Sequence, residues 1–231
     1  WFLHTNTDIV VLSLFTNIKE VSVYSVYALI TNGVRNLTSV VVNGLEAGFG
    51  SLIANNDLKK LNIVFRAFEV IISIVAITLF VTALTLFIPF IRLYTYEISD
   101  VNYIRPSITY LMIMAELLYC FRLPYNSVTL AAGHYKQTQT AAYIEALLNI
   151  ILSITLVLII GIPGVLIATI ISMVFRLIHF SWYISKNILY RPYIIFVKRM
   201  IVNTIIIVIL LFLDNNLFNL NIDNYYSFLF E

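Results

Sequence analysis

The sequence predicts an all-α fold, a polytopic transmembrane bundle of about seven helices. Hydrophobic residues make up 61% of the 231-residue chain, compared with about 45–50% in a soluble domain. Charged residues number 14 + 12 = 26, or 11%, compared with about 25% in soluble domains. Such a chain has too little polar surface to coat a water-soluble globule, and it is too rich in aromatic residues to be disordered. A multi-pass membrane protein is therefore expected.

Seven apolar runs approach the roughly 20 residues that a spanning helix needs. They are Phe2–Phe15, which is short, and then Val21–Leu45, Phe65–Ile91, Pro106–Leu130, Gln137–Ile160, Gly164–Ile184 and Ile194–Leu213. Pro106 suits a first helical turn, where a missing N–H costs nothing. Gly133 and Gly161 can each end a helix in the left-handed conformation. Pro89 and Pro124 lie in or near apolar runs, where we expect them to kink the helices.

These runs predict one transmembrane bundle over residues 1–213. Residues 214–231 are then an extracytoplasmic tail or the start of a further helix. The chain opens on Trp1 and ends on an aromatic run, Tyr225 to Phe230, so we expect it to be part of a longer protein. The alternative is a complete but small membrane protein.

Basic residues are distributed unevenly between the two sides of the predicted bundle. The connections after the second, fourth and sixth runs and the residues beside them carry eight, namely Lys59, Lys60, Arg66, Lys136, Lys186, Arg191, Lys198 and Arg199. The opposite side carries three, namely Lys19, Arg92 and Arg105. Because basic loops are retained in the cytoplasm, the end at residue 1 is predicted to be cytoplasmic.

Polar residues recur at helical spacing inside several apolar runs. In the second run they are Ser25, Asn32, Asn36, Ser39, Asn43 and Glu46, with Arg35 beside them. In the sixth they are Thr169, Ser172, Arg176, His179 and Tyr183, and in the fifth they are Glu145, Asn149 and Ser153. The fourth carries Glu116 and Arg122, with Tyr119 and Asn126 nearby. Residues three or four positions apart share a helix face, so each set forms a polar stripe.

A charge at mid-bilayer costs about 2.5–3.5 kcal/mol on insertion scales. Arg35, Glu116, Glu145 and Arg176 must therefore face protein or a water-filled cavity. In one interpretation they pair with one another, for instance Arg35 with Glu145, and only lock the bundle. Three helices with continuous polar faces favour the other interpretation, a shared hydrated path.

The sequence offers little for bond-making chemistry. It contains no H-E-x-x-H, no glycine-rich phosphate loop and no G-x-S-x-G elbow, and His4, His134 and His179 are scattered. Cys120 is the single cysteine and lies in an apolar run, which favours a packing role. The net charge of +2 gives no basic surface for nucleic acid. We expect no enzymatic activity, no metal, no cofactor and no nucleic-acid partner.

Two segments resemble a known family. AAGHYKQTQTAAYIEALLN (Ala131–Asn149), followed by GIPGVLIAT (Gly161–Thr169), is similar to the C-terminal half of the polysaccharide (Wzx-type) flippases. These belong to the MOP superfamily, with the MATE exporters and lipid II flippases. Three further segments agree, namely Asp8–Tyr27, Asn43–Ala54 and Phe180–Leu189. The resemblance covers the chain up to about Leu213, and its most specific part lies around Gly133 and Glu145.

The resemblance implies translocation of lipid-linked oligosaccharide, carried on undecaprenyl diphosphate, across the bacterial cytoplasmic membrane for O-antigen or capsule synthesis. It implies a MATE-like second bundle, so an N-terminal half would be a partner, together with membrane lipids and possible contacts to the polysaccharide polymerase and glycosyltransferases. An anionic substrate needs a cationic, hydrogen-bonding lumen. The substrate-cavity candidates are Arg35, Arg122, Arg176, His179, Asn32 and Asn36. The ion-coupling candidates, for a proton or sodium, are Asp8, Glu116 and Glu145.

Three other functions remain open. The nearest is another transporter of the same superfamily, either a multidrug exporter or a lipid II flippase. A membrane-embedded glycosyl- or prenyl-transferase should carry an acidic metal-binding loop, and the sequence has none. The third is a scaffold that transports nothing.

Overall fold

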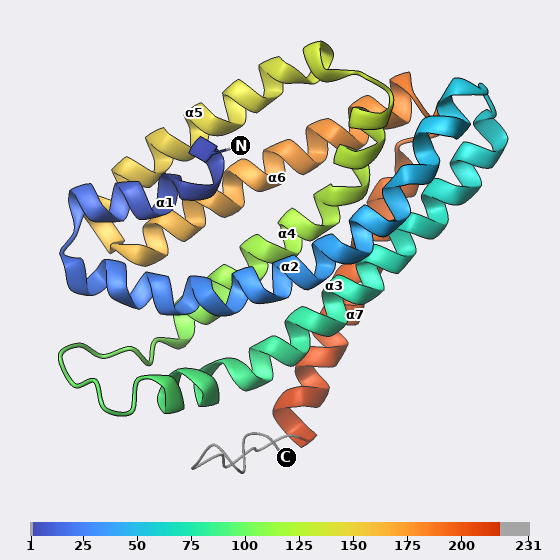
Figure 1. Ribbon diagram of the computed structural model, residues 1–231. Helices are drawn as coiled ribbons and strands as arrows, with labels where there is room; N and C mark the ends of the chain where they lie inside the picture. The colour runs from blue at the N-terminus through green and yellow to red at the C-terminus, as the bar shows by residue number, and fades with distance from the viewer. Residues whose placement is uncertain (1, 218–231) are drawn as a thin grey trace.

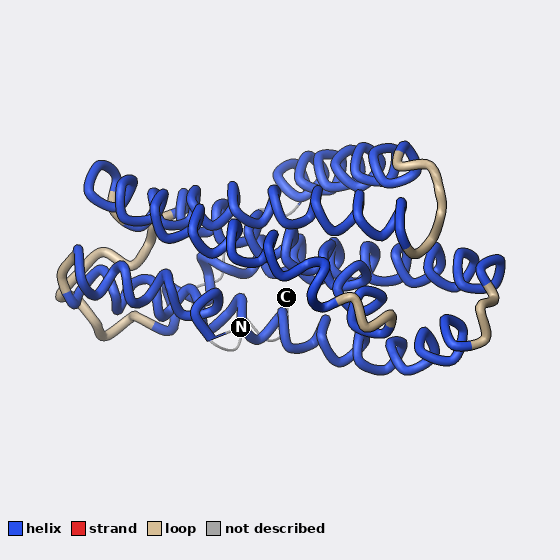
Figure 2. The backbone as a smooth tube through the Cα atoms, turned by 90° about the horizontal axis from the view of Figure 1, so that it is seen from above, coloured by secondary structure: helices blue, strands red, loops and turns tan. Residues whose placement is uncertain are grey.

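The computed structural model describes residues 2–217, except for the side chains of residues 2–6, 45–47 and 214–217. This part of the chain forms seven α-helices and no strand (Figure 1 and Figure 2). The helices are α1 (Phe2–Phe15), α2 (Ile18–Ala54), α3 (Leu58–Tyr94), α4 (Pro106–Ala131), α5 (Tyr135–Ile160), α6 (Ile162–Asn187) and α7 (Ile194–Leu217). The all-α bundle is thus confirmed. The side chains of His4 and Glu46 and most of the expected tail lie outside the described residues.

Five of these helices are long and apolar enough to cross a membrane, namely α2, α3, α5, α6 and α7 as far as Leu213. The chain is therefore a multi-pass membrane protein. Two of the seven expected spans, α1 and α4, do not meet this measure. α1 has only 14 residues. α4 has 26 residues and carries Glu116 and Arg122, which find partners on neighbouring helices.

Helices α2 and α3 each have 37 residues, or about 55 Å at 1.5 Å per residue. They exceed the roughly 30 Å of a hydrocarbon core, so their ends extend beyond it. Both start at a polar cap, because the side chain of Asn17 accepts from the N–H of Glu20 and that of Asp57 from the N–H of Lys60, each at 3.0 Å. The sequence prediction started both helices too late because these first turns lie outside the apolar runs.

The expected helix breaks are largely confirmed. Gly133 and Gly161 follow α4 and α5 with φ of 69° and 64°, in the region that favours glycine. Pro106 occupies the first turn of α4. Pro89 and Pro124 lie inside α3 and α4, and both helices continue past them.

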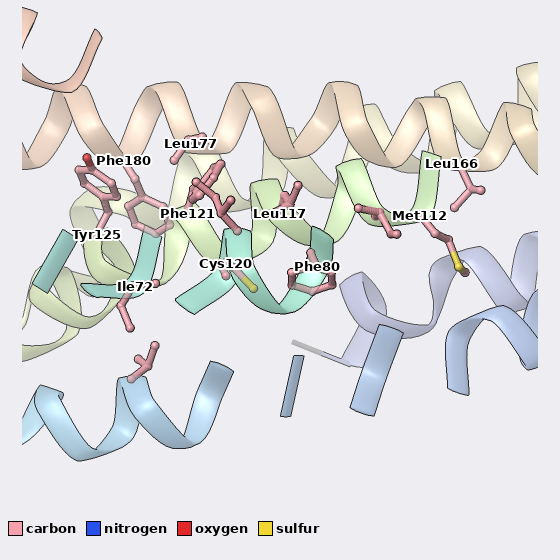
Figure 3. Packing of buried hydrophobic residues seen from close by; sticks show 14 of the residues in the cluster. Ile72, Phe80, Met112, Leu117, Cys120, Phe121, Tyr125, Leu166, Leu177 and Phe180 are labelled. Carbon is pink, nitrogen blue, oxygen red and sulfur yellow. The ribbon is translucent and has the colours of Figure 1, made fainter. Parts of the chain in front are cut away.

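Helix α4 runs through the centre of the bundle, where it packs against α2, α3 and α6 (Figure 1). It contributes Leu117, Cys120 and Phe121 to the apolar core, between Ile72 of α3 and Leu177 of α6 (Figure 3). α1 packs on α5, α2 and α6, whereas α7 packs on α3. The molecule therefore has an inner helix, α4, and a peripheral one, α7.

The connections lie at the two ends of the bundle (Figure 1). The α2–α3, α4–α5 and α6–α7 turns share one end, and the α1–α2, α3–α4 and α5–α6 connections share the other. The basic residues counted for one side therefore do gather towards one end. That this end faces the cytoplasm stays a prediction.

Candidate functional site

The polar stripes of α5 and α6 face inward. On α5 the buried positions include Thr138, Glu145, Asn149 and Ser153, whereas the exposed ones are mostly apolar. On α6 the polar residues Thr169, Ser172 and Arg176 are likewise buried. Both polar stripes thus point into the bundle, and on α6 apolar side chains such as Leu166 and Leu177 are buried beside the stripe. Glu145 and Arg176 are thus buried inside the bundle, as expected for charges within a span, and the shared hydrated path stays a prediction.

The first ion pair joins α2 to α4. Arg35 donates from Nε to Oε2 of Glu116 at 2.7 Å and from Nη2 to Oε1, which makes the contact bidentate. The Arg35 side chain is 21% exposed and that of Glu116 is 9% exposed. The pairing of Arg35 with Glu145 suggested from the sequence is wrong, because α2 packs against α4 and Glu145 is held by other residues.

Glu145 of α5 lies between two guanidinium groups. Arg122 of α4 donates from Nη1 to its Oε1 at 2.6 Å, and Nε of Arg176 on α6 lies 3.4 Å from its Oε2. Arg176 also donates to the carbonyl oxygen of Thr138 at 3.0 Å and lies over the ring of Phe180. One carboxylate therefore ties α4, α5 and α6 together.

Tyr119 connects these two groups of charges. Its ring centroid lies 4.8 Å from the guanidinium carbon of Arg35 and 5.1 Å from that of Arg122. A cation over an aromatic face is stabilised by the ring quadrupole. The charged residues thus form one continuous series, from Arg35 and Glu116 through Tyr119 to Arg122, Glu145 and Arg176, called below the central network.

Asp8 extends the central network onto α1. Its carboxylate accepts from the hydroxyl of Tyr24 at 3.0 Å and from that of Thr169 at 3.0 Å. Asn149 donates to the same Thr169 hydroxyl at 3.0 Å. Asp8 is 8% exposed, and none of the described basic side chains forms an ion pair with it. Among the described side chains, only hydroxyl groups donate hydrogen bonds to this buried carboxylate.

A small cavity opens between Asp8 and the first ion pair. Its polar walls are Asp8, Tyr24, Arg35, Glu116, Tyr119 and Thr169. Its volume of about 40 Å³ suffices for a few water molecules at roughly 10–15 Å³ each. A sugar would not fit, so the cavity suits water or a small cation.

Helix α2 presents a second polar surface, which is open. Asn32, Asn36 and Asn43 are all exposed on it; Asn36 directly follows Arg35, Asn32 lies about one turn before it and Asn43 about two turns after it. They lie in a helix long and apolar enough to span a membrane. An amide that faces hydrocarbon without a hydrogen bond costs several kcal/mol. This α2 polar face must therefore meet water or another protein.

The sequence-predicted residues thus fall into three groups. Arg35, Glu116 and Asp8 line the cavity, and Arg122, Arg176 and Glu145 continue the central network beyond it. Asn32 and Asn36 lie on the exposed α2 polar face. His179 lies apart on a half-buried side of α6, stacked on Tyr183 with ring centroids 6.2 Å apart.

A second buried cluster, the Glu69 cluster, was not predicted from the sequence. Glu69 of α3 is 2% exposed and accepts from Arg191 at 2.7 and 3.0 Å and from the hydroxyl of Tyr125. Nη1 of Arg199 lies 3.6 Å from the same carboxylate. Burial acts to lower the pKa of the Arg191 guanidinium, but its hydrogen bonds with Glu69 outweigh burial and raise that pKa. A lone carboxylate inside an expected span was the signal that could have found it.

The chemistry available is that of ion pairs, hydroxyl groups and a few water molecules. Within the described part of the chain, no group of three His, Cys, Asp or Glu side chains could hold a metal ion. The chain matches no family model, no curated protein and no solved structure.

Proposed function

We propose that the chain forms one bundle of a lipid-linked oligosaccharide flippase of the polysaccharide (Wzx-type) class. It would move undecaprenyl-diphosphate repeat units across the bacterial cytoplasmic membrane. The observation that carries this proposal is the exposed α2 polar face next to the ion pair of Arg35 and Glu116. Such a face needs water or protein beside it, and two bundles around a hydrated path supply both. The family resemblance of Ala131–Asn149 supports the same class.

The charges of the central network suggest how substrate and ion could be coupled. The network with Asp8 holds three carboxylates and three guanidiniums, namely Asp8, Glu116, Glu145, Arg35, Arg122 and Arg176, so its formal charge is zero. Protonation of Asp8 would change the formal charge of these six side chains from zero to +1 without breaking an ion pair. That charge lies beside the α2 polar face, where it would favour a diphosphate. Asp8 therefore suits ion coupling better than Glu116 or Glu145, whose charges are taken up by arginines.

The cavity beside Asp8 holds a few waters at most, so the headgroup would not pass through it. In the proposed cycle the sugar and diphosphate follow the α2 polar face, between this bundle and a partner bundle. The prenyl chain stays in the lipid. Asp8 then acts on the substrate through the charge of the central network rather than by contact.

The decisive experiment replaces Arg35 in the full-length transporter and measures surface polysaccharide at matched protein levels. We expect Arg35→Ala to abolish export and Arg176→Ala to abolish it as well. Arg92 is exposed, so Arg92→Ala serves as the control and should leave export unchanged. Because Arg35→Ala also strands the buried Glu116 carboxylate, the double variant Arg35→Ala/Glu116→Ala is needed. A binding role predicts that the double variant is stable but inactive. Full export by it would mean that the pair only locks the bundle.

A cation exporter of the same superfamily is the second candidate. The zero net charge of the network favours it, because a lumen built only for anions would carry an excess of arginine. Efflux of a cationic dye from cells, lost on Asp8→Asn and independent of polysaccharide synthesis, would support this candidate over the flippase.

A further inference from the structure

A groove of about 470 Å³ runs between α3 and α7, away from the central network. Its walls are mainly apolar and include Val70, Ile74, Ile77, Val202, Ile206 and Leu210. Only 11% of the α7 span is buried, so this side of the molecule is open. The floor holds one internally satisfied polar contact, from Asn203 to Ser73 at 3.1 Å.

One end of the groove is cationic. Lys198 and Arg199 both line it, and Lys198 forms no ion pair with any described acidic residue. Arg199 shares the carboxylate of Glu69 with Arg191, which already makes two hydrogen bonds to it. Arg191 and Arg199 carry two positive charges against the single negative charge of Glu69, so the three side chains have a net charge of +1. With Lys198, and counting only the described residues, the groove mouth therefore carries a surplus of about two positive charges.

The dimensions of the groove fit one lipid leaflet. Lys198 lies about 6 Å along α7 from its first residue, close to the end of the candidate span Ile194–Leu213, from where a long lysine side chain can reach the headgroups. From Ile195 to Leu210 the groove extends about 22 Å at 1.5 Å per residue. One leaflet contributes about 15 Å of hydrocarbon, half of a core of roughly 30 Å. An acyl chain anchored at Lys198 therefore fits within the groove.

We propose that this groove binds an anionic phospholipid of the bilayer, with its phosphate at Lys198 and Arg199 and one acyl chain between α3 and α7. The apolar walls alone would accept any lipid or a helix. The unbalanced positive charge selects an anionic headgroup. This site is independent of the proposed transport function, since it shares no residue with the central network or the α2 polar face.

Native mass spectrometry of the full chain tests the proposal. The detergent-purified protein is titrated with phosphatidylglycerol or with phosphatidylcholine of the same acyl chains. We expect tighter binding of phosphatidylglycerol, and Lys198→Ala should weaken it about fivefold, the effect of one surface cation, while leaving phosphatidylcholine binding unchanged. Lys59→Ala is the matched control, because Lys59 is exposed towards the same end but does not line the groove. Lys59→Ala should change the binding of neither lipid.

A second variant tests the apolar part of the groove. Val202 is 52% exposed, so Val202→Trp should fold and place its ring over the groove. We expect it to reduce the binding of both lipids. Equal affinity for the two lipids, equal effects of Lys59→Ala and Lys198→Ala, or no effect of Val202→Trp would each overturn the site. So would a dimer that forms without lipid and is broken by Val202→Trp, because a second copy would then occupy the groove.

Discussion

The central network and the Glu69 cluster use the same chemistry in different settings. Each places a carboxylate against two arginines with a tyrosine nearby. Around Glu69 the protein leaves only about 10 Å³ of cavity, and the side chains of Glu69 and Arg191 are 2% and 3% exposed. The central network borders a larger cavity, includes the 21%-exposed Arg35, and adjoins the open α2 polar face.

This difference distinguishes a cluster that only fixes the packing of helices, called below a lock, from one that lies beside the proposed transport path. A buried ion pair by itself is weak support for a function, because it can serve packing alone. The Glu69 cluster joins α3, α4, α7 and the α6–α7 connection, and its tightest pair, Glu69 with Arg191, is enclosed, whereas Arg199 also lines the groove between α3 and α7. The central network adds a carboxylate without a described cationic partner, Asp8, and a route to an exposed polar surface. Access and an unneutralised group, rather than the ion pairs, mark the functional region.

The largest effect on stability is expected at Glu69. Glu69→Gln leaves two guanidiniums without their carboxylate in a buried site, which should cost about 3–5 kcal/mol of unfolding free energy. A marked fall in the thermal unfolding midpoint in detergent would show it. Glu97→Gln, at an exposed position in the α3–α4 connection, is the control and should melt like the parent. An unchanged unfolding midpoint for Glu69→Gln would mean that the Glu69 cluster does not stabilise the packing of these helices.

A smaller stability effect with a larger functional one is expected at Asp8. Asp8→Asn retains an oxygen that can accept from Tyr24 or Thr169, so the loss should be about 1 kcal/mol, the size of one hydrogen bond. Because the amide cannot change charge, export should no longer respond to the ion gradient across the membrane. Gradient-dependent export in vesicles measures this, with the exposed Asp100→Asn as control. Export that still follows the gradient would exclude Asp8 as the coupling group.

The smallest stability effect is expected on the α2 polar face. Asn36 is exposed, so Asn36→Leu should change the unfolding free energy by no more than about 0.5 kcal/mol. Export should nevertheless fall, because an apolar side chain would replace a hydrogen-bonding group along the path. Val40→Leu, one turn away and 69% exposed, serves as the control. Normal surface polysaccharide in Asn36→Leu would mean that substrate does not use this face.

The sequence determined the helices and the character of each face. Length and apolarity place five of the spans, and Gly133 and Gly161 follow the ends of two helices with positive φ. The spacing of Glu145, Asn149 and Ser153 correctly placed these three side chains on one buried stripe. This works because residues three or four apart on a helix share a face whatever the helix packs against.

Only the tertiary structure decided which charges meet. Periodicity assigns a residue to a face of its own helix, but its partner depends on which helix lies opposite and at what height. Arg35 pairs with Glu116 because α2 packs on α4. Glu69 is a lock because the turn after α6 returns Arg191 to α3, across more than a hundred residues of chain. Such contacts are set by the packing of whole helices, which the local pattern of the sequence does not encode.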